Sequence, residues 1–205
     1  VSFMEFTADD KYVYAGTNIG RDKVALVLME PSTCEEIEVL YEHEKYDVDS
    51  ISFSRLQKKL LAVYCRGHKE PVRHYFDEEE RQLRERIRAH FPGKRVGMAD
   101  CDKAEQRMLL YVGSDRTRGA YYYYDVNEDA PRKVAELAPW LDEAEMVEMH
   151  PVNYTTRDGW DIEAYLSLPK GYTLETARQL PVVVNPHGGP WARDAWGYSS
   201  EVQFL

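Results

Sequence analysis

The chain has 205 residues, of which 43% are hydrophobic and 12% aromatic, so it can bury a sizeable core and its composition excludes extended disorder. Its formal net charge of −10 argues against nucleic acid and anionic membranes as partners. No apolar run is long enough to span a bilayer, and the sequence opens at Val1 without a basic and apolar leader. A longer parent protein could carry such a leader, so both the cytoplasm and the periplasm stay open as compartments.

The cysteines give no sign of a metal centre or a disulfide framework. Cys34, Cys65 and Cys101 are widely separated and odd in number, and none lies beside a histidine at ligand spacing. We expect them to be small buried hydrophobic residues in strands, and we expect no metal and no cofactor.

The first two-thirds of the chain consists of short strand patterns separated by polar turns, in three successive sets. The first set is Val1–Phe6, Tyr12–Ala15, Val24–Met29 and Ile37–Tyr41. The second is Ile51–Phe53, Leu60–Cys65 and Val72–Phe76, and the third is Val96–Asp100, Met108–Gly113, Ala120–Val126 and Arg132–Leu137. Each set predicts one sheet of a repeating structure.

Two of these sets resemble each other in detail. Residues 14–18 followed by 23–26 correspond to residues 112–115 followed by 119–122: a strand ends at glycine, a small polar loop follows, and an apolar strand restarts. The copies lie two periods of about 45–50 residues apart, which is the spacing of four-stranded propeller blades. The sequence therefore predicts about three blades of a partial β-propeller, since a complete propeller has at least four.

One helix interrupts the strands. Asp77 to Glu80 place acids in a first turn and the arginines up to Arg88 place bases in the last turn, which suits the helix dipole. Glu80 and Arg84 form an i,i+4 pair, and Leu83, Ile87 and Phe91 form an apolar stripe. We interpret it as a helix packed on a blade edge, rather than an acidic cluster that grips a substrate amino terminus. The Tyr121–Tyr124 run likewise predicts a strand rather than a platform for stacked bases.

The pattern of predicted elements changes after about residue 140. Val152–Thr155 and Ile162–Leu168, joined by Asp158-Gly159, predict a hairpin. The valines of Leu180–Val184 lack alternation and predict a strand buried on both faces. The turn His187-Gly188-Gly189-Pro190 follows, and Tyr198–Leu205 predicts the start of a helix for which Ser199 is the N-cap candidate.

A glycine pair after a buried strand has a chemical use. It permits backbone conformations closed to other residues and leaves room for a substrate to approach the main-chain N–H groups. In open α/β sheets, active sites lie at the carboxyl ends of strands. In α/β-hydrolases, the turn after the third strand supplies one amide of the oxyanion hole.

A family resemblance rests on four segments that occur in order: Pro151–Tyr154, Arg157-Asp158-Gly159, Tyr165–Gly171 and Pro181–Asp194. The last includes Trp191-Ala192-Arg193-Asp194 after the glycine turn. Together they resemble the start of the catalytic domain in serine peptidases of the prolyl oligopeptidase family, especially its acylaminoacyl-peptidase and dipeptidyl-peptidase-like branches. The resemblance implies a mostly β fold, with a partial propeller over residues 1–140 and the first strands of an α/β-hydrolase domain over residues 141–205.

The resemblance also implies roles for individual residues. The amide of Gly189 would be an oxyanion donor, Gly188 would form the turn and His187 would shape the site without being the general base. The sequence contains no Gly-x-Ser-x-Gly elbow. The segment most similar to one, residues 197–201, has glutamate where the second glycine is required. We therefore expect a fragment that is inactive alone, from a parent that hydrolyses peptides through an acyl-enzyme. We also expect the fragment to self-associate through open strand edges.

Two other readings stay open. One is a propeller-type protein-interaction module without an enzymatic parent, which gives no reason for the His187–Pro190 turn. The other is an esterase-like hydrolase, which Pro190 disfavours because esterases usually carry a third glycine there.

Overall fold

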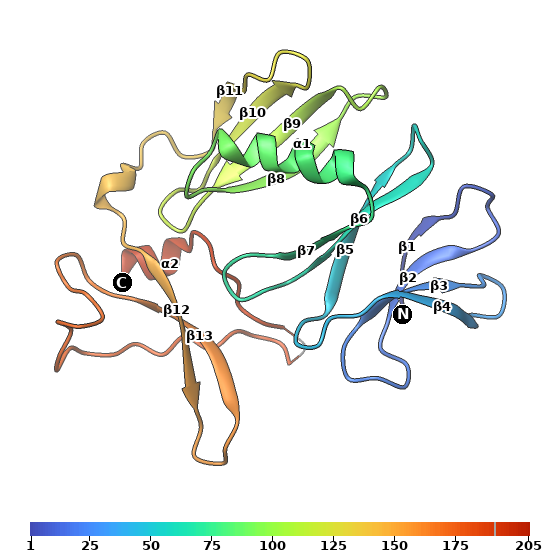
Figure 1. Ribbon diagram of the computed structural model, residues 1–205. Coiled ribbons are helices and arrows are strands. Elements are labelled where there is room, and N and C mark those ends of the chain that lie inside the picture. The colour runs from blue at the N-terminus through green and yellow to red at the C-terminus, as the bar shows by residue number, and fades with distance from the viewer. Residues whose placement is uncertain (191) are drawn as a thin grey trace. The chain divides into compact units, whose positions relative to one another are not determined.

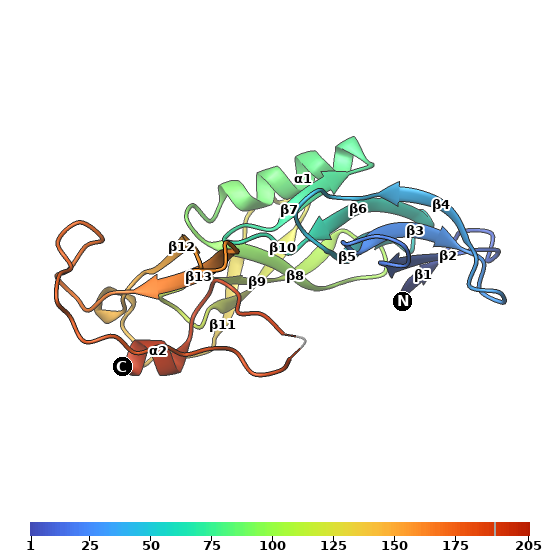
Figure 2. The same cartoon turned by 90° about the horizontal axis from the view of Figure 1, so that it is seen from below.

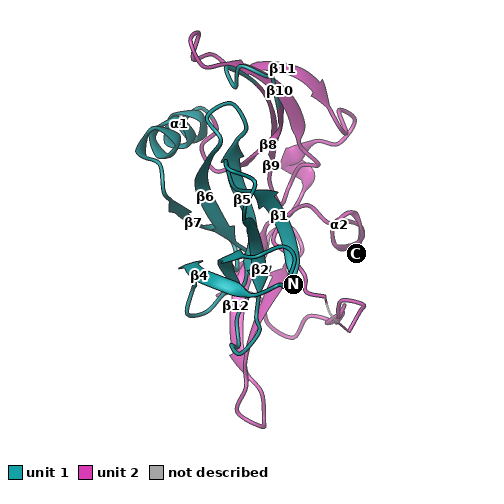
Figure 3. Cartoon of the chain, turned by 90° about the vertical axis from the view of Figure 1, so that its right-hand side faces the viewer, with its two compact units in different colours: residues 1–90, 101–107 teal, residues 91–100, 108–205 magenta. Residues whose placement is uncertain are grey.

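Strands dominate the chain, and they form four separate antiparallel sheets in the described part (Figure 1). The structure is a computed structural model that describes residues 1–190 and 192–205. It divides into two compact units, residues 1–90 with 101–107 and residues 91–100 with 108–205 (Figure 3).

The first sheet lies in the first unit and is a four-stranded meander. Its β3 is almost entirely buried, whereas the outer β4 is largely exposed. Backbone bonds such as Thr7 N to Tyr12 O at 2.9 Å close the tight connections between strands. The strands, in spatial as in chain order, are β1 (Ser2–Phe6), β2 (Val13–Thr17), β3 (Ala25–Met29) and β4 (Glu36–Tyr41).

The second sheet, also in the first unit, packs against the first. It contains β5 (Val48–Ser54), β6 (Lys59–Cys65) and β7 (Val72–Tyr75), the three strands that its sequence pattern predicts. Leu26 of β3 forms one buried cluster with Val48, Val63 and Cys65. Neighbouring propeller blades bury their faces against each other in this way.

The helix α1 (Glu78–Ala89) follows β7 and packs beside it (Figure 2). Asp77 caps it, because its carboxylate accepts the Glu80 N–H at 2.8 Å. The Glu80 side chain is buried and accepts from Ser52 Oγ at 3.1 Å and from Arg84 Nε at 2.7 Å. This glutamate thus holds the helix on its sheet, which agrees with the interpretation of a packed helix.

The third sheet has the order β11-β10-β9-β8. Its connection between β9 and β10 needs Gly119, whose φ is 92° and whose added Cβ would lie 2.7 Å from the Val112 carbonyl oxygen. Tyr124 is fully buried and donates to Asp129 Oδ1 at 2.5 Å, so the tyrosine run serves packing. The strands are β8 (Arg95–Cys101), β9 (Arg107–Gly113), β10 (Ala120–Asp125) and β11 (Arg132–Glu136).

The remainder of the second unit begins with a short 3₁₀ turn at Glu143–Glu145. The hairpin of β12 (Met149–Thr155) and β13 (Asp161–Ser167) follows, with Thr155 opposite Asp161 next to the turn that contains Asp158-Gly159. Residues 168–190 and 192–199 contain no helix or strand, and α2 (Ser200–Phe204) follows, which Ser199 caps by accepting the Val202 N–H at 3.4 Å. The hairpin and the N-cap predicted from the sequence are confirmed.

The predicted strand at Leu180–Val184 is wrong. Val182, Val183 and Val184 are 79%, 68% and 81% exposed, and none of the strands in the described ranges pairs with this segment. A strand buried on both faces needs a strand beside it and elements covering each face. The described residues supply neither, so the segment forms no strand and its valines are open to solvent.

The cysteine prediction is correct for one residue of three. Cys65 is buried in β6, as expected. Cys34 is exposed in a turn at a φ of 59°, and Cys101 is half-buried at the end of β8.

Neither of the helices described is long and apolar enough to cross a membrane.

Candidate functional site

The candidate site is the turn at His187, Gly188 and Gly189, which is exposed along its length. Gly189 has a φ of 148°, which L side chains rarely adopt, so glycine is required for the backbone path. The His187 ring contacts the backbone of its neighbour, with Nδ1 2.8 Å from the Gly188 carbonyl oxygen. Neither glycine N–H donates a hydrogen bond within the described residues, so both amides are available to a ligand.

No side chain of the described residues completes a reaction centre at this turn. Ser199 uses its hydroxyl oxygen as the cap of α2. Among residues 1–190 and 192–205, no group of three His, Cys, Asp or Glu side chains is placed to hold a metal ion. The turn by itself can therefore stabilise a negative oxygen through its N–H groups, but it cannot attack a substrate.

Trp196 fixes the chain seven residues after Gly189, and it is only 4% exposed. Its indole Nε1–H donates to the carbonyl oxygen of Met149 in β12 at 2.8 Å. Its own carbonyl oxygen accepts from Arg95 Nη1 at 2.6 Å, and the Arg95 guanidinium carbon lies 4.8 Å from the indole ring centre. Because Arg95 opens β8, this tryptophan joins the segment after the turn to the third sheet and to the hairpin.

A second contact lies closer to the turn. Arg193 Nη2 is 3.0 Å from Glu163 Oε2 in β13, and Tyr165 of the same strand lies beside it. Burial raises the pKa of the Tyr165 phenol above its ordinary value. The charge of Arg193 and a hydrogen bond from the Trp196 backbone act in the opposite direction. The phenol is therefore neutral at physiological pH and serves as a hydrogen-bonding partner for this segment.

A third contact holds α2. The Gln203 side chain bonds both main-chain groups of Val147: its Oε1 accepts from the N–H at 2.9 Å and its Nε2 donates to the carbonyl at 2.8 Å. The same Nε2 is 3.1 Å from the carbonyl oxygen of Asp115 in the β9–β10 loop. The buried Asp115 carboxylate in turn accepts the Met149 N–H at 2.7 Å. The helix α2 is thus bonded to the segment between β11 and β12 (residues 137–148), called the connector below, and to the third sheet.

Two curated proteins resemble this sequence over nearly its full length. A dipeptidyl aminopeptidase BIII from Pseudoxanthomonas mexicana is 27% identical over 206 residues, which cover 97% of this chain and 29% of that protein. A dipeptidyl peptidase family member 6 from Caenorhabditis elegans is 23% identical over 212 residues, covering 95% and 28%. The chain therefore spans less than a third of the length of these relatives. No protein-family model matches the sequence.

Two solved structures resemble the fold of this chain. A structure from a study of two prolyl endopeptidases, on inter-domain dynamics in catalysis and specificity, has a TM-score of 0.53 and 14% identity, covering 80% of this chain and 24% of that one. Ligand-free prolyl oligopeptidase B from Galerina marginata has a TM-score of 0.50 and 13% identity, covering 83% and 24%. These two structures show that most of the chain shares the fold of part of a prolyl oligopeptidase.

The prolyl oligopeptidase resemblance confirms the predicted fold class, a mostly β chain with propeller-like sheets. Sequence reasoning singled out His187, Gly188 and Gly189, and the structure places them together on one exposed turn. It quoted Arg193 and Tyr165 only as parts of motifs, and it missed Arg95, Trp196 and Gln203. A tryptophan in a polar, irregular stretch was the available signal for Trp196, since such a large ring is seldom left in solvent. Trp191 of the quoted motif lies outside the described residues.

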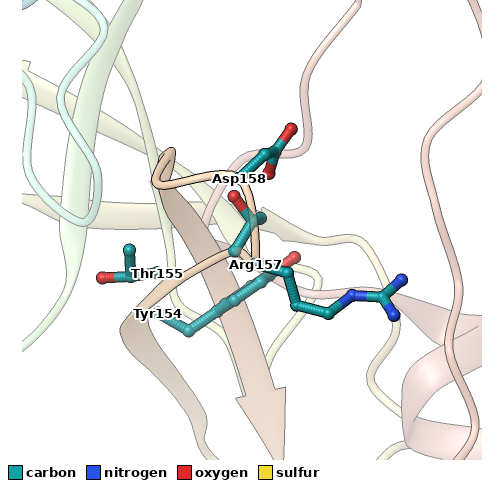
Figure 4. Close-up of a pocket in the computed structure, with 5 residues that line it drawn as sticks. Tyr154, Thr155, Arg157 and Asp158 are labelled. Carbon is teal, nitrogen blue, oxygen red and sulfur yellow. The ribbon is translucent and has the colours of Figure 1, made fainter.

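A second feature of this prolyl oligopeptidase-like chain is a shallow recess at the tip of the hairpin. Consecutive residues 154–158 line it, and the side chains of Arg157 and Asp158 point in different directions (Figure 4). No groups converge there on one point, as a catalytic centre would require. The recess is therefore a weaker candidate than the glycine turn.

Proposed function

We propose that this chain is the part of a serine peptidase in which the propeller, residues 1–140, passes into the catalytic domain, residues 141–205. The observation that carries the proposal is the Gly188-Gly189 turn, which offers two unused N–H groups in a conformation that requires glycine. The two sequence relatives, which match almost the whole of this chain, are dipeptidyl peptidases, and this supports a peptidase.

In the proposed reaction, the Gly189 amide donates to the oxygen of the scissile carbonyl as it becomes negative during attack by a serine. Such a donor contributes about 3–4 kcal/mol to the stabilisation of the transition state. Gly188 shapes the turn, and His187 lines it. The nucleophile, its histidine base and the aspartate would come from the parent protein beyond these residues, because residues 1–205 contain no Gly-x-Ser-x-Gly elbow.

The substrate of the parent would be an oligopeptide. The two curated relatives carry names that describe release of dipeptides, which supports a substrate with a short peptide on the amino-terminal side of the cut. The reaction needs no metal and no cofactor, since acyl transfer to serine uses only the triad and the oxyanion donors.

We also propose that the chain associates with copies of itself. The exposed valines 182–184 form an apolar run whose backbone pairs with no strand of the described residues, and such a run is a template for strand pairing.

Labelling with a fluorophosphonate probe tests the peptidase proposal. We expect no serine in residues 1–205 to react, including Ser199, whose hydroxyl caps α2. We expect one serine to react in a product of the same gene extended beyond Leu205, within a Gly-x-Ser-x-Gly elbow encoded in roughly the next hundred codons. Stoichiometric labelling within residues 1–205, or an extended reading frame without an elbow, would refute the proposal.

A further inference from the structure

The exposed glycine turn needs a means of being held in place. Before it, residues 181–186 are exposed and pair with no strand of the described ranges. Within residues 1–190 and 192–205, residues 187–189 make one hydrogen bond, between His187 Nδ1 and the Gly188 carbonyl oxygen. Its position therefore depends on the anchors that follow it in the chain, at Arg193 and at Trp196.

These anchors are close enough to restrict the turn. An extended chain advances at most about 3.3–3.6 Å per residue, so the small number of residues between the turn and an anchor sets an upper bound on how far the turn can lie from that anchor. Arg193 is four residues after Gly189 and pairs with Glu163, but both side chains are partly open to solvent, where such a pair is worth little. Trp196 is seven residues after Gly189 and is the only buried residue among 181–190 and 192–200.

The anchor at Trp196 depends on Arg95. The guanidinium makes two different contacts with the same residue, a hydrogen bond to its carbonyl oxygen and a stack on its indole ring. A planar guanidinium can do both at once, whereas a lysine ammonium cannot. The third partner is the Met149 carbonyl oxygen, which accepts a hydrogen bond from the indole Nε1–H of Trp196.

We propose that Arg95 and Trp196 are positioning residues for the oxyanion turn. They fix the chain after the turn to the third sheet and thereby limit where Gly188 and Gly189 can lie, without touching the substrate. This inference rests on the proposed role of the turn. Its physical basis is that a shift of about 1 Å at a catalytic group can lower a rate about 100-fold.

The kinetic test uses the extended peptidase with Arg95→Met, which keeps an unbranched apolar stem but loses the guanidinium. Arg132→Met is the matched control, because Arg132 lies in the same sheet and its guanidinium carbon is also 4.8 Å from an aromatic ring, that of Tyr123. Rates are normalised to active sites by fluorophosphonate titration. We expect kcat to fall about tenfold or more for Arg95→Met, with KM changed less than about twofold, and no change for Arg132→Met. Arg95→Lys, which keeps a donor for the carbonyl but loses the fork, should fall between the two.

A second measurement uses the 205-residue chain and reads the anchor directly by amide hydrogen exchange. Arg95→Met and Trp196→Phe should each speed exchange in residues 192–199, and Arg95→Met should leave the β12–β13 hairpin unchanged. An unchanged kcat for Arg95→Met, an equal fall for Arg132→Met, or unchanged exchange would each overturn the positioning role. An extended wild-type protein that hydrolyses no peptide would instead overturn the proposed function, and the exchange experiment would still decide the anchor.

Discussion

Gly188 and Gly189 are neighbours of the same type, yet the structure places different demands on them. Gly189 has a φ of 148°, whereas Gly188 is not among the residues with positive φ and a Cβ added to it would meet no atom within 4 Å. Alanine should therefore fit at Gly188 and be strained at Gly189. A strained backbone of this kind costs about 1–3 kcal/mol, which the turn can relieve by changing its conformation.

This difference predicts the behaviour of two substitutions in the extended peptidase. Gly189→Ala should lower kcat/KM about 100-fold, at the lower end of the loss that follows removal of an oxyanion donor, because the relaxed turn no longer aims its amide. Gly188→Ala should change kcat/KM less than about threefold. Steady-state kinetics on a peptide substrate give both values. Equal losses would mean that the conformation of Gly189 is not what the site requires.

Other residues show what sequence could and could not reveal about the site. Gly188 and Gly189 could be proposed because a glycine pair permits backbone conformations closed to other residues and leaves room for a substrate at the main-chain N–H groups. Arg95 and Trp196 could not be paired, because 101 residues separate them and neither lies in a motif that specifies a partner. Contacts of this kind depend on how distant segments pack, and a local pattern carries no information about that.

At the scale of elements, the strands of the three sheets were predicted well because apolar runs and turn residues alternate at short intervals. β6, for example, was expected at Leu60–Cys65 and extends over Lys59–Cys65. The run at Val182–Val184 has the same composition and was predicted wrongly. Strand propensity describes how a segment fits a sheet, and this segment has no neighbouring strand in the described part of the chain.

The helix α2 gives a prediction about a connection between elements. Gln203→Leu keeps the size of the side chain but removes its bonds to both main-chain groups of Val147 and to the Asp115 carbonyl. Local opening of residues 142–149 should become easier by about 1–3 kcal/mol, because polar groups are left without partners. Hydrogen exchange at the Val147 amide measures this.

Phe204→Ala is the matched control, since Phe204 lies in the same helix and is 89% exposed. It should leave the Val147 exchange rate unchanged. If both substitutions speed exchange alike, the helix as a whole holds the connector and Gln203 has no special part in it.

At the scale of the whole molecule, the chain combines sheets that bury apolar faces with a segment that does not. In the first unit, two sheets share a buried cluster around Leu26, as adjacent blades do. Blades contact only their neighbours, so the shared interface of such a pair is a main source of its stability. The exposed valines belong to a different kind of structure, in which a strand must be paired and covered on both faces. The two sheets of the first unit are thus stabilised by contacts within the chain. The valine segment, in contrast, can become a paired strand only with further chain or with another molecule.

This difference predicts that self-association runs through the valine segment. Light scattering over a range from micromolar to near-millimolar should show a mass that rises with concentration. Val183→Lys should return the chain toward the monomer mass, because a charge in a pairing strand opposes edge-to-edge contact. The matched control is Val134→Lys in the edge strand β11, since Val134 is 62% exposed and Val183 is 68% exposed. Loss of association in the Val134 variant alone would assign the contact to the propeller edge, and a wild-type monomer at every concentration would exclude both edges.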